Sequence, residues 1–376
     1  LRRQAAALAL HLQAQGVVPG DRVAAYLPNI PQTMVAFLAV VSVGGVWSVC
    51  APDMGTNAVL DRFAQITPTV LIGCDGVTYG GKDHPRTAVL AQLQGALPSV
   101  RHTILCRVLN TADTLPGAAD WDTIVARNDA AVAGFEPLWL PFDHPLWIVY
   151  SSGTTGMPKP LVHDHGGTML NGMAHKTVMY DVGCSYEPNS WGERFMWYSS
   201  TGWVMWNAQL SGLLSGTTCV IYDGNPGGSK DKPDWGVLWR YAAQEGVTFF
   251  GAGAAYFNHC MKADLNLTEH AGLHLGMALA RHAQHHVVKR APQFGRRRPG
   301  EAGPVAARHI GRQRELAHHQ QAAGDVLHAA VHLAVSIAED AQLEHLGQHA
   351  LGHGFGVAFF SAQQQQQTLA NLAYGL

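Results

Sequence analysis

The sequence predicts an α/β fold in which mostly parallel sheets are flanked by helices. Two observations support this prediction. Short apolar runs of strand length alternate with longer runs of helix length, and one short run, 146–150, is apolar throughout, as expected for a strand that is buried on both faces. This alternation favours βαβ units with right-handed crossovers, whose ligands bind beyond the carboxyl ends of the strands.

Each element follows from its local pattern. Residues 2–15 are rich in Ala and Leu, and Gly16 is placed to end that helix, because glycine is common just after a helix C-terminus. Further helices are predicted at 31–43, at about 56–66 and 85–95, and near 207–214 and 236–244. Strands are predicted at 22–27, 47–50, 70–74, 103–106 and 146–150, and near 195–199, 218–222 and 247–250.

Composition excludes several classes of protein. The 376 residues are 47% hydrophobic, which is enough for a sizeable core, and their net charge of -2 argues against a basic nucleic-acid-binding surface. No apolar stretch reaches the length of a membrane span, so neither a nucleic acid nor a membrane is expected as a partner. The 6 cysteines are scattered without a C-x-x-C pair, which favours reduced thiols and a cytoplasmic location. Because Leu1 lies inside a helical pattern, the true N-terminus is expected to be missing.

The most informative segment follows the strand predicted at 146–150. It reads Ser151-Ser152-Gly153-Thr154-Thr155-Gly156-Met157-Pro158-Lys159-Pro160. Glycines let backbone N–H groups approach phosphate oxygens, hydroxyls donate further hydrogen bonds, and a lysine supplies positive charge. The segment does not have the G-x-x-x-x-G-K-[ST] pattern of a Walker A loop. We interpret it as a polyphosphate-binding loop; the alternative is a solvated Ser/Gly turn.

Four further segments accompany this loop. Phe142-Asp143-His144-Pro145-Leu146 precedes it, and Val162-His163-Asp164-His165-Gly166-Gly167, Thr201-Gly202-Trp203-Val204-Met205-Trp206-Asn207 and Tyr222-Asp223-Gly224-Asn225-Pro226 follow it. With the loop, they resemble the adenylate-forming enzymes of the acyl-CoA synthetase superfamily and, within it, the acetoacetyl-CoA synthetases. The resemblance extends from Leu1 to about Leu267. It implies that residues 1–268 form part of the large N-terminal domain of the adenylate-forming fold, without completing it.

The resemblance implies an acetoacetate–CoA ligase, in which ATP adenylates acetoacetate and coenzyme A then takes the acyl group as a thioester, releasing AMP and pyrophosphate. By the same resemblance, the β- and γ-phosphates are cradled by Ser151, Ser152, Gly153, Thr154, Thr155 and Gly156. Lys159 is the implied catalytic residue, because it adds positive charge at the phosphates. Mg²⁺ is expected to bridge the phosphates, and no side chain is assigned as a metal ligand. The oligomeric state is left open.

The segment at 201–207 is the predicted wall of the acyl pocket. By resemblance, Trp203, Val204 and Met205 line the acyl group, with Trp203 and Trp206 bracketing a slot, and Asn207 donates a hydrogen bond to the 3-keto oxygen. The alternative is that these aromatic residues are ordinary core at the start of a helix.

Three other residues have a functional and a structural interpretation. By resemblance, Lys82, after two glycines, contacts the phosphates of coenzyme A; otherwise it is an exposed lysine in a turn. His163 and His165 contact substrate or make structural hydrogen bonds beside the end of the sheet.

The composition changes after about residue 270. Of the 21 histidines, 11 lie from Met277 onward, whereas all 10 tryptophans and all 6 cysteines lie at or before Cys260. No alternation of strands is predicted there, so residues 269–376 are interpreted as a His/Gln/Ala-rich tail that is not family sequence. We expect residues 275–376 to share no core with residues 1 to about 265. A shifted or wrong-strand reading of a GC-rich gene and a natural low-complexity extension are the two explanations.

Several alternatives remain open at this level. The acid could be acetate or propionate in place of acetoacetate. The family's later motifs, with their Mg²⁺-binding glutamate, ribose-binding aspartate and C-terminal catalytic lysine, are not found after Leu267, so the chain could be a catalytically silent nucleotide-binding fragment. A metal-binding protein is a third possibility, because His345, His349 and His353 would share one face of a helix. Chance in a histidine-rich segment explains that spacing as well.

Overall fold

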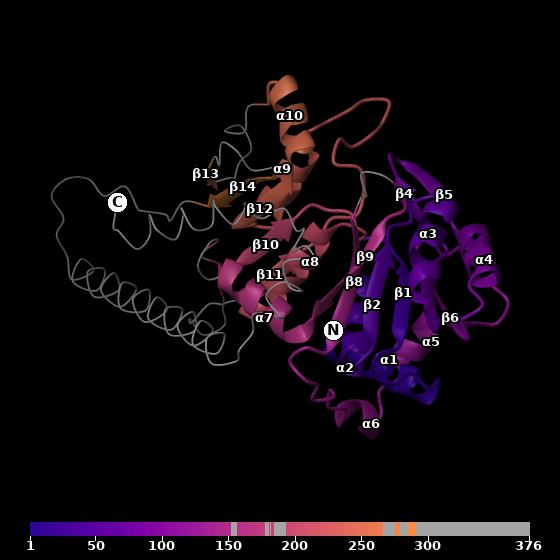
Figure 1. Ribbon diagram of the computed structural model, residues 1–376. Helices are drawn as coiled ribbons and strands as arrows, with labels where there is room; N and C mark the ends of the chain where they lie inside the picture. The colour runs from indigo at the N-terminus through magenta and orange to yellow at the C-terminus, as the bar shows by residue number, and fades with distance from the viewer. Residues whose placement is uncertain are drawn as a thin grey trace, which may run out of the picture. The chain divides into compact units, whose positions relative to one another are not determined.

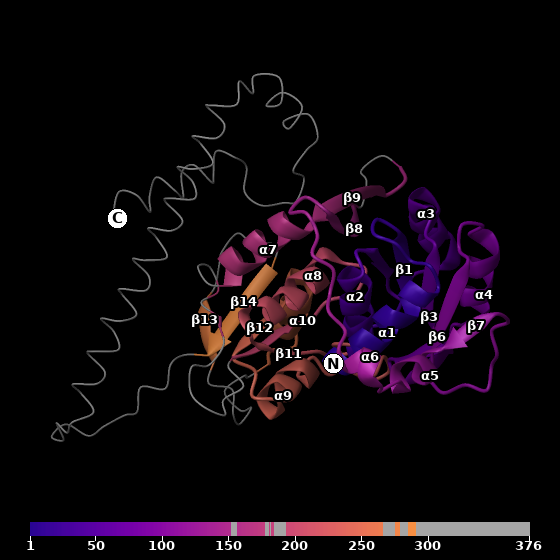
Figure 2. The same cartoon turned by 90° about the horizontal axis from the view of Figure 1, so that it is seen from below.

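The computed structural model describes residues 1–151, 156–176, 180, 182–183 and 193–265, and the backbone of 275–278 and 285–290. The chain divides into two compact units, Leu1–Pro292 and Gln293–Leu376, and every described residue belongs to the first. Figures 1 and 2 show this first unit as two sheets with helices packed against them. The predicted α/β class is confirmed.

The first sheet has seven strands and is parallel except at one edge. From edge to edge its strands are β7 (Ala118–Asp120), β6 (His102–Cys106), β3 (Val70–Cys74), β1 (Arg22–Tyr26), β2 (Val46–Cys50), β8 (Pro145–Ser151) and β9 (Lys159–Asp164). Only β8 and β9 are antiparallel to each other. Every residue of β2 and β3 is buried, as expected for central parallel strands that are covered on both faces.

Helices cover both faces of this sheet, and the side chains of β1 alternate between the two cores. Val23 and Ala25 pack with one core, and Ala24 and Tyr26 with the other, because successive strand residues point to opposite faces. The first core is built with α1 (Arg2–Ala14), α2 (Pro31–Ser42) and α5 (Trp121–Ala126), and the second with α3 (Thr56–Ile66) and α4 (Thr87–Ala96). The one-turn helix α6 (Ala130–Ala133) packs beside α1.

The second sheet has five strands. Its strand order is β11 (Thr218–Val220), β10 (Arg194–Trp197), β12 (Phe249–Gly253), β14 (His285–Arg290) and β13 (Leu275–Ala278). The first three are parallel, and β14 is antiparallel to both of its neighbours. The remaining elements are the hairpin β4 (Gly76–Tyr79) and β5 (Lys82–Pro85), the helices α7 (His165–Ala174), α8 (Val204–Leu210), α9 (Val237–Gln244) and α10 (Ala254–Lys262), and the 3₁₀ helix η2 (Ser211–Ser215).

The predicted elements agree with the structure to within a few residues at most ends, but several observed elements were not predicted. These include the hairpin β4–β5, strand β7 and helices α5, α6 and α10. Strand β9 begins inside the polyphosphate segment, at Lys159, and helix α7 follows it, where no elements were predicted. Helix α8 begins at Val204, three residues before its predicted start at 207, and the chain leaves α-helical geometry at Ser211. Two strands also lie beyond residue 270, where none was predicted, and β14 joins the second sheet beside β12. The proposed boundary at residue 268 stays a prediction.

Three hydrogen bonds join the chain just after β1 to the segments that follow β10 and β11 of the second sheet. The hydroxyl of Thr201 donates to the carbonyl of Leu27 at 2.7 Å, and the indole N–H of Trp206 donates to the side-chain oxygen of Asn29 at 3.0 Å. The amide nitrogen of Asn29 in turn donates to the carbonyl of Tyr222 at 3.4 Å. The start of α8 is therefore fixed to the end of a central strand.

No helix within the described residues is long and apolar enough to cross a membrane. The five described cysteines, Cys50, Cys74, Cys106, Cys219 and Cys260, are all free thiols, and all but Cys219 are buried. This agrees with the predicted reduced state for these five; Cys184 lies outside the described residues.

Candidate functional site

The polyphosphate segment connects two antiparallel strands. As predicted, it follows a strand, β8, which lies parallel to β2 with Trp147 opposite Trp47. Only residues 146–148 of this strand are buried, because β9 lies beside it at the edge of the sheet. Ser151 ends β8 and pairs with Lys159, the first residue of β9, so the segment between them forms the turn of a hairpin. Residues 152–155, which include Ser152, Gly153, Thr154 and Thr155, lie outside the described residues.

The described end of this turn is exposed and is attached to helix α3. Gly156 and Lys159 are both exposed, and the side-chain amide of Gln65 donates to the carbonyl of Pro158 at 2.9 Å. The predicted catalytic lysine therefore sits at the base of the hairpin, with its side chain open to solvent. An ammonium group in this position is available to an anionic ligand that binds at the turn.

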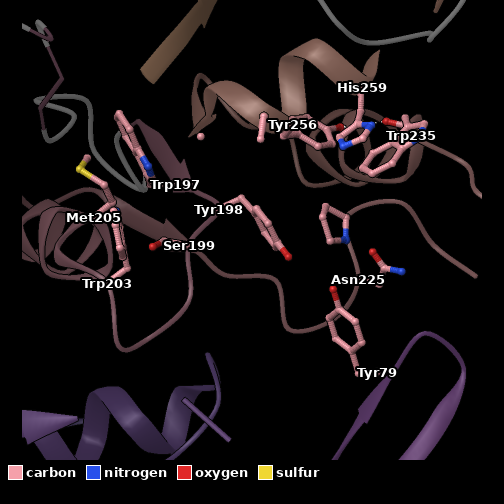
Figure 3. A pocket seen from close by; sticks show the side chains of 13 residues that line it. Tyr79, Trp197, Tyr198, Ser199, Trp203, Met205, Asn225, Trp235, Tyr256 and His259 are labelled. Atoms are coloured by element: carbon pink, nitrogen blue, oxygen red, sulfur yellow. Dashed lines mark hydrogen bonds between the residues drawn. The ribbon is translucent and has the colours of Figure 1, made fainter. Parts of the chain in front are cut away.

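A pocket with a volume of about 380 Å³ lies at the carboxyl ends of β10 and β12. Figure 3 shows its side chains, which come from the end of β10, the start of α8, the loop before α9, helix α10 and the β4–β5 hairpin. Most of the lining is aromatic: Tyr79, Trp197, Tyr198, Trp203, Trp235, Tyr256 and the imidazole of His259. Ser199, Met205, Asn225, Pro226, Gly253 and Ala255 complete it. An apolar pocket with few polar groups is typical of a small-molecule site.

The structure brings two of the four predicted acyl-pocket residues to this pocket. Trp203 and Met205 line it, and Trp203 is 55% exposed, so its ring is not part of the packed core. Val204 is partly buried and Asn207 is buried, and neither is among the lining residues. Successive residues at the start of a helix face different directions, which explains why α8 presents alternate members of the segment to the pocket.

The predicted slot between Trp203 and Trp206 is not formed. Trp206 is fully buried, stacked at 6.4 Å on Trp47 and packed edge-on against Phe37 at 6.4 Å, both centroid to centroid. Its N–H is satisfied by Asn29. The core interpretation therefore holds for Trp206, whose indole points into the first core, whereas Trp203 lines the pocket. That Trp203 contacts an acyl group stays a prediction.

The hairpin that carries Lys82 reaches the pocket through a different residue. Gly80 and Gly81 both have positive φ, 60° and 79°, which is the geometry of a two-residue type I′ turn. This turn pairs Tyr79 directly with Lys82, and Tyr79 lines the pocket. Lys82 is exposed on the next strand. The hairpin therefore offers one aromatic ring to the pocket and one cation beside it.

His163 and His165 make structural contacts and do not line the pocket. The ring of His163 lies 6.2 Å from that of Trp147, and the ring of His165 lies 5.7 Å from that of His144, both centroid to centroid. Burial lowers the pKa of both histidines, and the neighbouring His144 adds to the effect at His165. Their neutral forms are therefore favoured beside the end of the sheet.

Trp235 and His259 are among the lining residues that were not singled out from the sequence. Trp235 comes from the loop before α9, and Tyr256 and His259 lie three positions apart on α10, which places them on one face of that helix. The i, i+3 spacing of Tyr256 and His259 is visible in the sequence and would have placed both side chains on one helix face. Nothing in the sequence showed that Trp235 faces them, because that contact joins separate elements.

Lys176, just after α7, is an unusual buried cation. Its side chain is fully buried, and its amine has no hydrogen-bond partner among the described residues. The amine lies 2.9 Å from the ring centroid of Phe195 and 5.4 Å from that of Tyr180. Burial lowers the pKa of Lys176 to about 7, against an opposing effect from Cys219. The same aromatic cluster contains Trp197, whose ring lines the pocket.

No group of three or more His, Cys, Asp or Glu side chains within the described residues is placed to hold a metal ion. The histidines at 345, 349 and 353, which suggested a metal-binding alternative, lie outside the described residues. The structure therefore gives that alternative no described site.

Comparison with known proteins places these features in a family. The model of the family described as AMP-binding enzyme matches residues 1–350. Acetoacetyl-coenzyme A synthetase of Rhizobium meliloti (strain 1021) is 40% identical over 265 residues, covering 70% of this chain and 39% of the relative. Acetoacetyl-CoA synthetase of Mus musculus is 35% identical over 280 residues, covering 73% of this chain and 40% of the relative.

A solved structure gives the same result. Acetoacetyl-CoA synthetase from Streptomyces lividans superposes with a TM-score of 0.64 at 47% sequence identity, covering 71% of this chain and 39% of that chain. This chain thus spans about 39% of the length of that structure and of the Rhizobium relative.

Proposed function

The chain belongs to the AMP-binding enzyme family, and from this premise we propose that its function is that of an acetoacetate–CoA ligase. In the proposed reaction, ATP adenylates acetoacetate with release of pyrophosphate, and coenzyme A then displaces AMP to give acetoacetyl-CoA. One observation carries the proposal: the two segments that resemble acetoacetyl-CoA synthetases, the polyphosphate hairpin and 201–207, lie at the carboxyl ends of parallel strands, where α/β sheets bind ligands.

The polyphosphate hairpin is the proposed ATP site. Ser151, Ser152, Gly153, Thr154, Thr155 and Gly156 would supply hydroxyl and backbone donors to the β- and γ-phosphates. Lys159 would add a positive charge at the base of the turn, which its exposed position allows. The first step brings a carboxylate against a polyphosphate, so charge neutralisation and positioning supply most of the catalysis. Mg²⁺ would be held by the nucleotide phosphates, and no described side chain is assigned to it.

The aromatic pocket is the proposed acyl site. Trp203 and Met205 would enclose the short carbon chain of acetoacetate, since both line the pocket. Val204 and Asn207 are kept as candidates from the same segment. Asn207 would have to turn its buried side chain toward the pocket to donate a hydrogen bond to the 3-keto oxygen.

Coenzyme A is the proposed acceptor of the acyl group. Lys82 is exposed beside the pocket-lining Tyr79 and is suited to contact its phosphates. The free thiols of the described cysteines agree with a reducing, cytoplasmic environment, which we propose as the location.

Acid preference tests the proposed function. A chimaera in which residues 1–265 replace the matching part of the Rhizobium meliloti enzyme is expected to use acetoacetate with a kcat/KM on the order of 10-fold or more above acetate and butyrate. A site that hydrogen-bonds a keto group rejects analogues that lack it, because a buried polar group is then left unpaired. Preference for acetate would instead make the chain an acetyl-CoA synthetase.

A catalytically silent nucleotide-binding protein is the second candidate. It is favoured by the absence, from the sequence after Leu267, of the family's Mg²⁺-binding glutamate, ribose-binding aspartate and C-terminal lysine. We expect purified residues 1–376 to form no measurable acyl-CoA from acetoacetate, ATP, Mg²⁺ and coenzyme A. Turnover in that assay would show that the residues after 268 complete the enzyme.

A further inference from the structure

The imidazole of His259 lines the pocket and has no role in the function proposed above. The imidazole of His259 lies parallel to the indole of Trp235, with ring centroids 4.1 Å apart and planes at 4° (Figure 3). Trp235 is itself held: a Cβ at Gly227 would lie 3.2 Å from its ring carbons, so the backbone at Gly227 packs directly against the indole. The stack therefore fixes the plane of an exposed imidazole at the pocket.

Most other polar groups of the pocket are already engaged. The hydroxyl of Tyr198 donates to the backbone carbonyl of Gly224 at 3.0 Å, and the hydroxyl of Tyr256 donates to the backbone carbonyl of Trp235 at 2.9 Å. Ser199 donates to the carbonyl of Ser200 at 3.1 Å. The side-chain oxygen of Asn225 accepts the backbone N–H of Gly227 at 3.0 Å.

Among the hydroxyl, amide and imidazole groups of the lining, this leaves the imidazole of His259, the N–H₂ of Asn225 and the hydroxyl of Tyr79 for a ligand, as far as the described residues show. Burial raises the pKa of Tyr79, so its phenol keeps its proton at neutral pH and acts as a hydrogen-bond donor. The amide N–H₂ of Asn225 can only donate. Of the three groups left for a ligand, the imidazole is thus the one whose ring nitrogen offers a lone pair to act as a general base. The indole face beneath it stabilises the positive charge that then forms.

Resting on the proposed function, we infer that His259 is the general base of the second half-reaction and that Trp235 is its positioning residue. A ring nitrogen of His259 uses its lone pair to take the proton of the coenzyme A thiol, and the S–H bonding electrons remain on sulfur. The thiolate attacks the acyl carbon of the acyl adenylate. A C–S bond forms, and the acyl C–O bond breaks with its electron pair leaving on the phosphate oxygen of AMP.

The purified chain tests this without turnover. Coenzyme A is titrated into residues 1–376 at neutral pH, with tryptophan fluorescence reporting binding and the ultraviolet thiolate band reporting proton transfer. The wild-type chain is expected to bind coenzyme A and show the band. His259→Gln, which can hydrogen-bond but is not a base at this pH, is expected to bind coenzyme A and lose the band. Trp235→Leu is expected to weaken the band, because the imidazole is no longer held.

Two controls define the outcomes. Desulfo-coenzyme A should bind without a band, which assigns the signal to sulfur. Asn258→Gln, an exposed neighbour on the same helix outside the pocket lining, should leave the band unchanged. A band that persists in His259→Gln, or binding by the wild-type chain without a band, would overturn the role of His259 alone. Failure of the wild-type chain to bind coenzyme A would count against the proposed function as well.

Discussion

Lys176 shows how one residue can lower the stability of a fold that packs well around it. Aromatic rings surround its amine in place of a carboxylate, and the charged form is penalised by burial. Its pKa falls to about 7 in the folded chain, whereas an unfolded lysine titrates near ~10.4. Between these two values the unfolded chain holds more protons, so the free energy of unfolding must rise with pH.

Replacing this lysine by methionine is therefore expected to stabilise the protein. Lys176→Met keeps the apolar stem and removes the unpaired amine, and should raise the free energy of unfolding by about 1–3 kcal/mol at pH 7. The gain should be largest at pH 7 and below, where the amine carries its charge in the core, and should shrink as the pH rises towards ~10. Urea unfolding of the variant and the wild type at several pH values measures this difference in the free energy of unfolding.

Lys262→Met is the matched control, because Lys262 is exposed at the end of α10. It should change the free energy of unfolding little at any pH. A destabilised Lys176→Met, or a gain that does not vary with pH, would mean that the amine has a partner that compensates its charge.

At the scale of elements, the β8–β9 hairpin relates strand geometry to the proposed adenylation chemistry. Its antiparallel pairing brings Lys159 back opposite Ser151, so a lysine eight positions later in the sequence lies beside the end of the strand. The edge position of β9 leaves that lysine exposed. The hairpin can therefore present the hydroxyl and backbone N–H donors of its turn and the ammonium group of Lys159 to the same ligand.

Removing this cation is expected to weaken adenylation. In the chimaera described above, Lys159→Ala should reduce the kcat/KM for ATP-dependent pyrophosphate exchange by an amount equivalent to about 1–3 kcal/mol, the value of a charge-assisted hydrogen bond. Lys232→Ala, an exposed lysine outside both the hairpin and the pocket lining, is the control. Unchanged exchange kinetics in Lys159→Ala would refute the assignment of Lys159 to the phosphates.

At the scale of the whole molecule, three observations bear on where the folded domain ends. The sequence places its end at 268, the family model matches as far as 350, and the backbone of β14 pairs with β12. We propose that residues 1–268 form the family domain and that 269–376 are not family sequence.

Limited proteolysis tests this boundary. A resistant fragment of residues 1 to about 268 is expected, because cleavage concentrates where few buried contacts hold the chain. Mass spectrometry of the fragment gives its end. A fragment that keeps residues 285–290 would move the boundary beyond β14, and one that extends to Leu376 would contradict the division altogether.

The sequence by itself determined the fold class and the position of the hydroxyl-rich segment. Both depend on local pattern: apolar runs such as Val70–Cys74 specify buried strands wherever they pair, and a Gly/Ser/Thr run after a strand specifies a loop. The same local pattern was insufficient for Lys159–Asp164, whose exposed edge strand has the polar composition of a loop.

Only the tertiary structure decided which residues meet at the site. Trp203 and Trp206 look equivalent in sequence, yet one lines the pocket and the other is core, because Trp203 is the N-cap residue with extended backbone and Trp206 lies inside helix α8. The stack of His259 on Trp235 joins a helix to a loop 24 positions earlier, and Lys176 became notable only when aromatic rings from other segments enclosed it. Contacts between distant segments depend on how the elements pack, and no local pattern in the sequence encodes them.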